Sequence, residues 1–235
     1  MTVRLDGALA KATGMGRKDA RQYVNRGAVT VNGEVIRKAD FSVSLSDEIL
    51  FRGETLDLRE HLYVMLCKPE GTVCTTEDVA ESVLRLFPDS YRKRLFCVGR
   101  LDKDTTGLLL LTDDGDFDHR LMSPKHHAEK EYAVTLAQPL KETDIPLLEG
   151  GMTLENGETT RPCRVEKISD GACRITLCEG KYHQVKRMFA AVGNRVTALR
   201  RIRIGNLPLD PTLADGEWRD LTEEEIALLS AKSEL

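Results

Sequence analysis

The acidic residue Asp102 has sequence neighbours that suit a catalytic carboxylate. It lies between the basic residue Arg100 and the segment Thr105-Thr106-Gly107, for which we predict a turn. Four consecutive leucines at residues 108–111 then predict a strand that is buried on both faces. A carboxylate that precedes such a strand is rigidly supported, as a reacting group requires. We therefore interpret Asp102 as a candidate nucleophile or base, and the sequence does not separate these two roles.

A structural role is the alternative for every aspartate in this region. An aspartate before threonine and glycine usually stabilises a turn or caps a helix. On the local sequence alone, the structural role is the favoured interpretation of Asp102. We assign purely structural roles to its neighbours Asp104, Asp113, Asp114 and Asp116.

Two basic segments could supply a cation or bind phosphate. A carboxylate in a pocket that excludes water stays charged only beside a cation, because desolvation disfavours the ionised form. Residues 179–189 contain several candidates for this cation. The wider segment 181–205 has seven basic residues and no acidic one, and residues 11–38 have seven basic and two acidic residues. Such segments suit binding to a nucleic acid.

The overall net charge of −4 hides these basic segments. Residues 210–235 carry eight acidic and two basic residues, so the rest of the chain has a net charge of +2. No apolar run of about 18 residues predicts a membrane span, and the N-terminus lacks an apolar signal segment. Six cysteines without a Cys-x-x-Cys pair argue against a zinc or redox motif. We expect a cytoplasmic protein with reduced thiols.

The N-terminal residues predict a small unit of two helices and a hairpin. Asn32-Gly33 between β-forming residues is a strong hairpin signal, and Gly27 suits the end of a helix. The polar segment 53–60 then indicates a linker, so we predict one domain over residues 1–58 and another over 59–235. The predicted elements of the first domain are helices at 2–12 and 16–26 and strands at 28–31, 34–36 and 49–51.

The second domain mixes strands and helices without a regular alternation. That pattern favours an α+β domain with a largely antiparallel mixed sheet and flanking helices. A helix over residues 117–122 is expected to end before Pro124. The other predicted elements are strands at 62–67, 96–98, 108–111, 131–136 and 174–177 and helices at 82–87 and 184–192.

Several motifs resemble those of one enzyme family. Residues 99–116, GRLDKDTTGLLLLTDDGD, resemble the signature of the RsuA-type pseudouridine synthases, which isomerise uridine in ribosomal RNA. About the first 55 residues resemble the αL-type RNA-binding domain shared with a small-subunit ribosomal protein, through Arg4-Leu5-Asp6, residues 17–26, residues 27–33 and residues 46–49. The resemblance extends to Trp218-Arg219-Asp220-Leu221-Thr222 and covers nearly the whole chain.

The resemblance implies roles for individual residues. It places the family's catalytic aspartate at Asp102 and its paired basic residue at Lys186, a position where many relatives carry arginine. Tyr132 matches the active-site tyrosine, whose ring can stack on uracil and whose hydroxyl can relay a proton. Leu199 matches a position that packs against the pocket. Arg187 is the less favoured substitute for Lys186.

Other polar residues are expected to hold RNA. Arg17 and Lys18 lie four and three residues before Arg21, so the three can share one helix face, which suits contact with phosphates. The segment Lys68-Pro69-Glu70-Gly71 matches a further family motif and is expected to shape the sheet. The residues expected to hold RNA around the active site are Arg100, Lys103, His183, Gln184, Arg187, Arg200 and Arg201.

The implied activity is an RNA-modifying isomerase that converts a specific uridine of 16S ribosomal RNA to pseudouridine. The reaction breaks an N–C bond, rotates the base and forms a C–C bond, so it needs no metal or organic cofactor. The target base must first be flipped out of its stack. We expect a monomer without membrane association that binds ribosomal RNA or a ribosomal-subunit assembly intermediate.

Three alternatives remain. The first is a synthase for large-subunit (23S) ribosomal RNA, which we favour less because the chain ends in an acidic tail and not in the basic extension of some large-subunit relatives. The second is a non-catalytic RNA-binding assembly factor. The third is a metal-dependent nuclease that uses Asp102, Asp113, Asp114 and Asp116.

Overall fold

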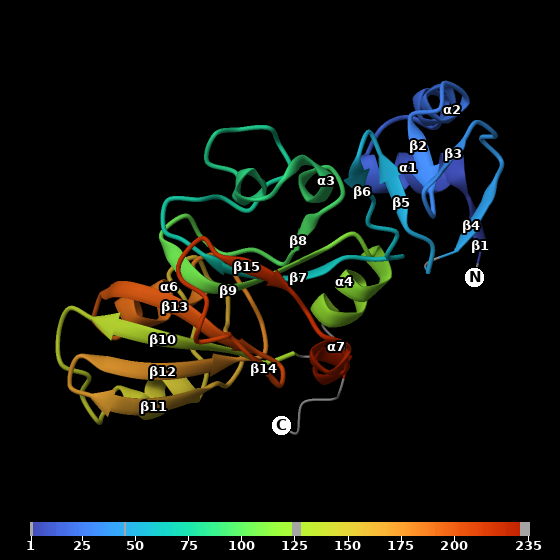
Figure 1. Ribbon diagram of the computed structural model, residues 1–235. Helices are drawn as coiled ribbons and strands as arrows, with labels where there is room; N and C mark the ends of the chain where they lie inside the picture. Colours follow the sequence, from blue (N-terminus) through green and yellow to red (C-terminus); the bar gives the residue numbers. More distant parts are fainter. Residues whose placement is uncertain (1, 45, 124–127, 231–235) are drawn as a thin grey trace. The chain divides into compact units, whose positions relative to one another are not determined.

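The computed structural model describes residues 2–44, 46–123 and 128–230 (Figure 1). The chain divides into two compact units. The first comprises Met1–Leu62 together with Phe87–Leu95, and the second comprises Tyr63–Leu86 together with Phe96–Leu235. Residues 87–95 therefore group with the N-terminal unit, although they follow the first strand of the second unit in sequence.

The first unit begins with a strand and not with a helix. β1 (Thr2–Arg4) pairs antiparallel with β4 (Ser42–Ser44), and α1 (Leu5–Thr13) starts directly afterwards. The prediction of a helix from residue 2 was therefore wrong at its start. Pairing with a strand about 40 residues away decided the local structure, and helical apolar spacing cannot reveal such a partner.

The rest of the first unit confirms the helix and hairpin predictions. Asn32 and Gly33 both have positive φ, 50° and 84°, as the turn between β2 and β3 requires. The four-stranded sheet has the order β3-β2-β5-β6. The elements are α2 (Arg17–Asn25), β2 (Val29–Val31), β3 (Glu34–Ile36), β5 (Ile49–Phe51), β6 (Glu54–Thr55) and α3 (Asp89–Arg92).

Helix α2 has one buried face and one basic face. Ala20 and Val24 point into a core that they share with Leu5 and Leu9 of α1 and with residues of the small sheet. The predicted RNA-binding residues Arg17, Lys18 and Arg21 are exposed. The packing of α2 thus leaves these three charges available to a partner.

The second unit is built on a nine-stranded mixed sheet with the order β11-β12-β10-β13-β9-β7-β15, in which β14 pairs with β13 and β8 pairs with β9. Within the described residues, β13 and β9 form its parallel pair and the other pairings are antiparallel. The prediction of an α+β domain with a largely antiparallel sheet is therefore confirmed. Figure 1 shows β10, β12 and β11 side by side at one end of this sheet.

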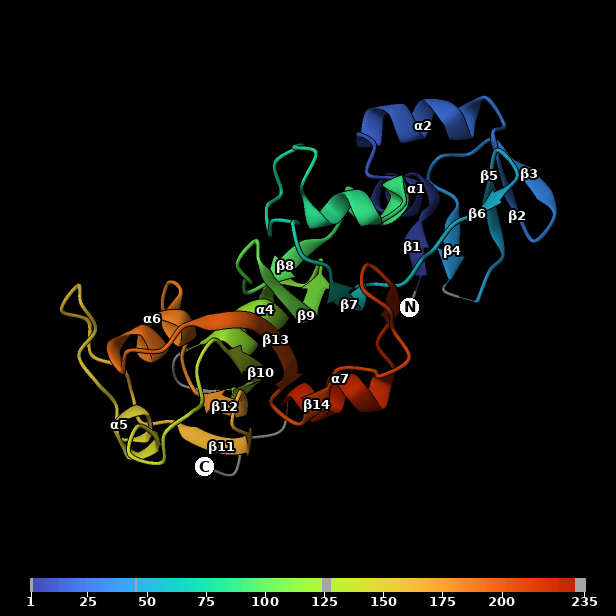
Figure 2. The same ribbon diagram turned by 90° about the vertical axis from the view of Figure 1, so that its left-hand side faces the viewer.

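The strands of the second unit are β7 (Tyr63–Lys68), β8 (Phe96–Val98), β9 (Thr105–Thr112), β10 (Lys130–Leu136), β11 (Arg164–Ser169), β12 (Ala172–Leu177), β13 (Val196–Ile204), β14 (Leu207–Pro208) and β15 (Trp218–Asp220). The helices are the 3-10 turn η1 (Val83–Leu86), α4 (Gly115–Met122), α5 (Ile145–Glu149), α6 (Gln184–Ala191) and α7 (Glu223–Ser230). Figure 2 shows α6 beside β13. None of the described helices is long and apolar enough to cross a membrane.

Strand β9 is longer than predicted. Thr105-Thr106-Gly107 does not form a turn but begins the strand, where it pairs with residues 199–201 of β13. Gly107 permits this pairing because its φ is +94° and a Cβ there would lie 2.3 Å from the carbonyl oxygen of Arg201. The following leucines, residues 108–111, are at most 1% exposed, which confirms the predicted buried strand.

Asp114 has the structural role that the sequence predicted. Its side chain accepts hydrogen bonds from the backbone N–H groups of Asp116 and Phe117 and so caps α4. The hydroxyl of Tyr63 also donates to Asp114 Oδ2, at 2.7 Å. Helix α4 ends at Met122 as expected, and Pro124 lies outside the described residues.

Candidate active site

A buried lysine holds the loop that carries Asp102 through hydrogen bonds to backbone carbonyl groups. Lys68 is fully buried, and its Nζ donates to the carbonyl oxygens of Pro69, Lys103 and Thr105 at 3.2, 3.4 and 2.9 Å. The N–H of Gly71 donates to the same Lys103 oxygen. Burial lowers the pKa of Lys68. The Lys68–Gly71 segment therefore supports the strand and also fixes the loop beside it.

Replacing Lys68 by methionine is expected to lower the free energy of unfolding by about 1–3 kcal/mol, because carbonyl groups that Lys68 now satisfies lose their donor. Urea denaturation of the two proteins measures this difference. Lys141→Met, which changes an exposed lysine, is the control and should leave stability unchanged. Equal stability of Lys68→Met and the unaltered protein would show that the loop does not depend on Lys68.

Asp102 forms the ion pair that the resemblance implied. Lys186 Nζ, on α6, lies 2.9 Å from Asp102 Oδ2, although the two residues are 84 positions apart in sequence. Lys186 also lies 2.5 Å from Oδ1 of Asp104, which the sequence analysis treated as a simple turn residue. One ammonium thus serves two carboxylates, and Asp104 is a site residue that sequence reasoning missed.

The balance of charges keeps Lys186 protonated. Burial opposes its charge, but the hydrogen bonds to Asp104 and Asp102 outweigh this effect and raise the pKa of Lys186. The hydrogen bond from Lys186 lowers the pKa of Asp104. Asp104 is 63% exposed and Asp102 is 27% exposed, so Asp102 is the more sheltered of the two carboxylates.

Asp102 borders a small pocket in the second unit with a volume of about 80 Å³. Tyr132 and Leu199, on the neighbouring strands β10 and β13, are 8% and 7% exposed and line it. Arg100, His183 and Gln184 line it as well. The pocket therefore gathers an acid, an aromatic ring and an apolar wall from four different segments of the chain.

Two residues expected to hold RNA make contacts within the protein. Arg187 does not line the pocket, and its Nη1 contacts Glu158 Oε2 at 2.8 Å and the carbonyl oxygen of Tyr182 at 3.1 Å. Arg201 is 2% exposed and donates from Nε to the carbonyl oxygen of Leu108. The expectation that Arg201 holds the RNA backbone was wrong, because β13 turns this side chain into the sheet.

The start of α6 is held by side-chain hydrogen bonds. Gln184 is 4% exposed, accepts from the N–H of Lys181 and donates to Glu179 Oε1 at 2.7 Å. The same Glu179 oxygen accepts from the N–H of Arg161. Within the helix, Val185, Met188 and Phe189 are buried at helical spacing. Lys186 lies between these positions and is only 23% exposed, in contact with Asp102.

The metal-dependent nuclease alternative lacks a ligand cluster. Among the side chains that the structure describes, no three from His, Cys, Asp and Glu gather as a metal site would require. Asp114 caps α4, and Asp102 binds Lys186. Two of the four carboxylates named for that alternative are therefore engaged separately.

Comparison with known proteins identifies the family. The family model of RNA pseudouridylate synthases matches residues 62–191, and the S4 domain model matches residues 3–49. The chain belongs to the RNA pseudouridylate synthase family. This synthase is 44% identical to the ribosomal small subunit pseudouridine synthase A of Haemophilus influenzae, over 97% of this chain and 99% of that protein. The enzyme of the same name from Escherichia coli strain K12 is also 44% identical, over 96% and 99% of the two chains.

A solved structure agrees with this assignment. The crystal structure of a pseudouridylate synthase superposes on this synthase with a TM-score of 0.70 and 44% sequence identity. The match covers 97% of this chain and 99% of the chain in that crystal structure. The pseudouridylate synthase match includes Asp102, Tyr132 and Lys186. The expected fold of an RNA-binding S4 domain followed by a synthase domain is confirmed.

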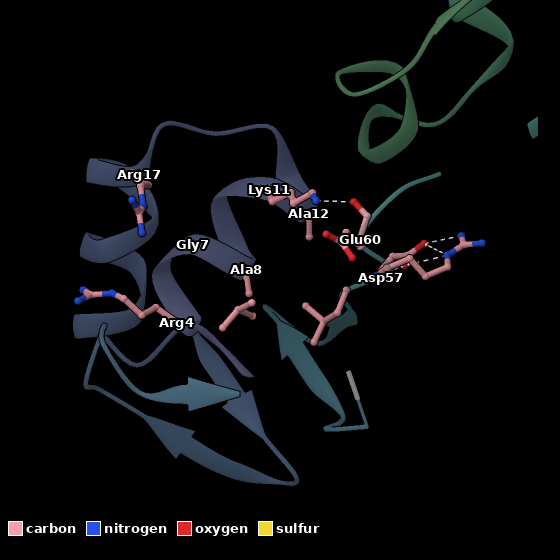
Figure 3. Close-up of a pocket in the computed structure, with 11 residues that line it drawn as sticks. Arg4, Gly7, Ala8, Lys11, Ala12, Arg17, Asp57 and Glu60 are labelled. Atoms are coloured by element: carbon pink, nitrogen blue, oxygen red, sulfur yellow. Dashed lines mark hydrogen bonds and ion pairs between the residues drawn. The ribbon is translucent and has the colours of Figure 1, made fainter. Parts of the chain in front are cut away.

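The first unit of this pseudouridylate synthase has a cavity of its own, of about 400 Å³. Figure 3 shows Arg4 and Arg17 on one side of α1 and Lys11, Asp57 and Glu60 on the other. Arg4 is paired with Asp6, and Lys11 donates to the carbonyl oxygen of Glu60. Of the three predicted RNA-binding residues on α2, Arg17 alone borders this cavity.

Proposed function

We propose that this protein converts a uridine of small-subunit (16S) ribosomal RNA to pseudouridine, with Asp102 as the catalytic carboxylate. The observation that carries this proposal is the contact between Asp102 and Lys186 at a pocket lined by Tyr132 and Leu199. The close relatives named as small-subunit synthases support the choice of RNA.

Each residue of the pocket has a task in the proposed reaction. Asp102 attacks the sugar as a nucleophile or acts as a base at the neighbouring ribose carbon, and Lys186 holds its carboxylate in place. Tyr132 stacks on the detached uracil while it rotates, and Leu199 forms an apolar wall. Arg100 and His183 contact the RNA around the flipped nucleotide.

Tritium release tests this function. Small-subunit RNA and particles from a strain that lacks the gene are labelled with uridine carrying tritium at C5, which loses that tritium when C5 becomes bonded to the sugar. The expected result is release from small-subunit material and none from large-subunit material. Release from the large subunit only would favour the 23S alternative. Binding without release would favour the assembly factor.

We further propose that residues 1–58 are an RNA-binding domain and residues 59–235 the catalytic domain. The exposed Arg17, Lys18 and Arg21 on α2 support this division, because such a face suits phosphate contact.

We also propose that the protein acts as a cytoplasmic monomer on an assembling small subunit. Sedimentation measures its oligomeric state, and comparing turnover on naked 16S RNA with turnover on assembly intermediates identifies the preferred substrate.

Replacing Arg17, Lys18 and Arg21 together by glutamine is expected to weaken RNA binding and flatten its salt dependence. Each lost phosphate contact should reduce the slope of log K against log salt by about 0.7–0.9. Binding titrations from 50 to about 200 mM salt measure this slope. Lys38→Gln removes one highly exposed charge from the same unit and should change the slope far less. An unchanged slope in the triple variant would remove this helix face from the RNA interface.

A further inference from the structure

We propose that Tyr182 and His183 form a stacking platform for a nucleobase that neighbours the target uridine in the substrate RNA. This inference rests on the proposed function. The rings of Tyr182 and His183 are stacked, with their centroids 3.8 Å apart and an angle of 18° between their planes. Tyr182 is nevertheless 74% exposed, so most of its ring remains open to a ligand.

The platform lies at the rim of the candidate active site. His183 Nε2 is 3.6 Å from Asp102 Oδ1, and His183 lines the same pocket as Asp102 and Tyr132. Tyr182 stacks on His183 and does not itself line this pocket. The expected ligand of Tyr182 is therefore the base that neighbours the flipped uridine in the RNA.

The segment that carries the two rings is fixed before RNA binds. Arg187 donates to the carbonyl oxygen of Tyr182 and is itself held by Glu158. His183 has a φ of +48°, an unusual conformation for a residue with a side chain, and it directly precedes α6. Such backbone conformations persist where the surrounding structure enforces them, often at functional sites. A ring that is already ordered loses little conformational entropy when it stacks on a base.

The chemistry of the surroundings favours a nucleobase over a protein side chain. The exposed cation Arg100 lines the same pocket as His183. A flat aromatic face near a cation suits unpaired nucleotides, in which rings hold bases and cations hold phosphates. Stacking tolerates any base, so the platform would orient the RNA without reading its sequence.

Three variants of Tyr182 test this inference by tritium release from small-subunit particles. Tyr182→Ala is expected to raise KM about 10- to 100-fold with kcat within about twofold, because base stacking contributes about 1–3 kcal/mol. Tyr182→Phe keeps the ring and should behave like the unaltered protein. Tyr182→Leu keeps an apolar side chain without a ring and should resemble Tyr182→Ala. The melting temperatures should agree, since the side chain is exposed.

Several results would overturn the inference. An unchanged KM in Tyr182→Ala, a loss confined to kcat, or normal KM in Tyr182→Leu would each exclude stacking. A rise in KM on particles without a rise on naked 16S RNA would show that Tyr182 contacts a ribosomal protein instead. These results differ from failure of the proposed function, in which the unaltered protein itself releases no tritium from small-subunit RNA.

Discussion

The Asp102→Asn variant is expected to lose at least about 1,000-fold in isomerisation rate, in the range seen when a catalytic carboxylate is removed from other enzymes. Asparagine has nearly the shape of aspartate, so the loop held by Lys68 should remain in place. It has no charge and cannot act as a nucleophile or base. Single-turnover tritium release from small-subunit RNA measures the rate, and RNA binding and thermal stability should stay close to normal.

Asp104→Asn is the matched control for this variant. Asp104 also contacts Lys186, but it is 63% exposed and does not line the pocket. Its replacement should reduce the rate by no more than about tenfold, because an exposed ion pair contributes at most about 1 kcal/mol. Normal turnover by Asp102→Asn would disprove the assignment of the catalytic carboxylate. Equal losses in both variants would show that the pair acts as one unit.

Replacing Lys186 by methionine is expected to reduce the rate by about 100-fold or more. The change removes the ammonium that contacts Asp102, so this carboxylate loses the charge-assisted hydrogen bond that orients it. It also removes the one cation that the carboxylates of Asp102 and Asp104 share. The rate is measured by tritium release under saturating RNA, so that weaker binding does not mask the chemical step.

Lys186→Arg separates charge from length at this position. Arginine preserves the positive charge but presents it in a planar fork, so it should retain activity within about tenfold of the unaltered protein. If Lys186→Arg is as inactive as Lys186→Met, the position requires the geometry of lysine and not its charge alone. If Lys186→Met remains fully active, Lys186 has no part in the reaction.

Local sequence was sufficient where a short signal determines the backbone. Asn32-Gly33 defined a hairpin because both residues accept positive φ, and the four leucines of β9 defined a buried strand. Local sequence was not sufficient where a distant partner decides. Thr105–Gly107 pair with β13, and Thr2–Arg4 pair with β4, neither of which a short window contains.

Strand β13 was not predicted from the sequence, because its charged residues are not typical of a strand within a sheet. Arg201 is fully inside the sheet, and its neighbours Arg200 and Arg203 pair with the carboxylates of Asp215 and Glu131. A run of arginines in a sequence suggests an RNA-binding surface, and only tertiary structure shows which of them face inward. The same limitation applies to Arg187, which the sequence assigned to RNA and the structure joins to Glu158.

The residues of the candidate site were predictable from the sequence, but their contacts with one another were not all predictable. The resemblance indicated Asp102, Lys186, Tyr132 and Leu199, and the structure brings all four to one pocket or its edge. It did not indicate that Asp104 shares the ammonium, since an aspartate in a turn has no local mark of an ion pair. The catalytic roles themselves stay predictions until the variants are measured.

The 84-residue separation between Asp102 and Lys186 has a consequence for synthesis of the protein. Strand β13, which pairs in parallel with β9, follows Lys186 in the chain. While the polypeptide is still being translated, the stretch that bears the acid emerges long before its cationic counterpart. We therefore expect an unfinished chain to be inactive until β13 has been translated and can pair with β9.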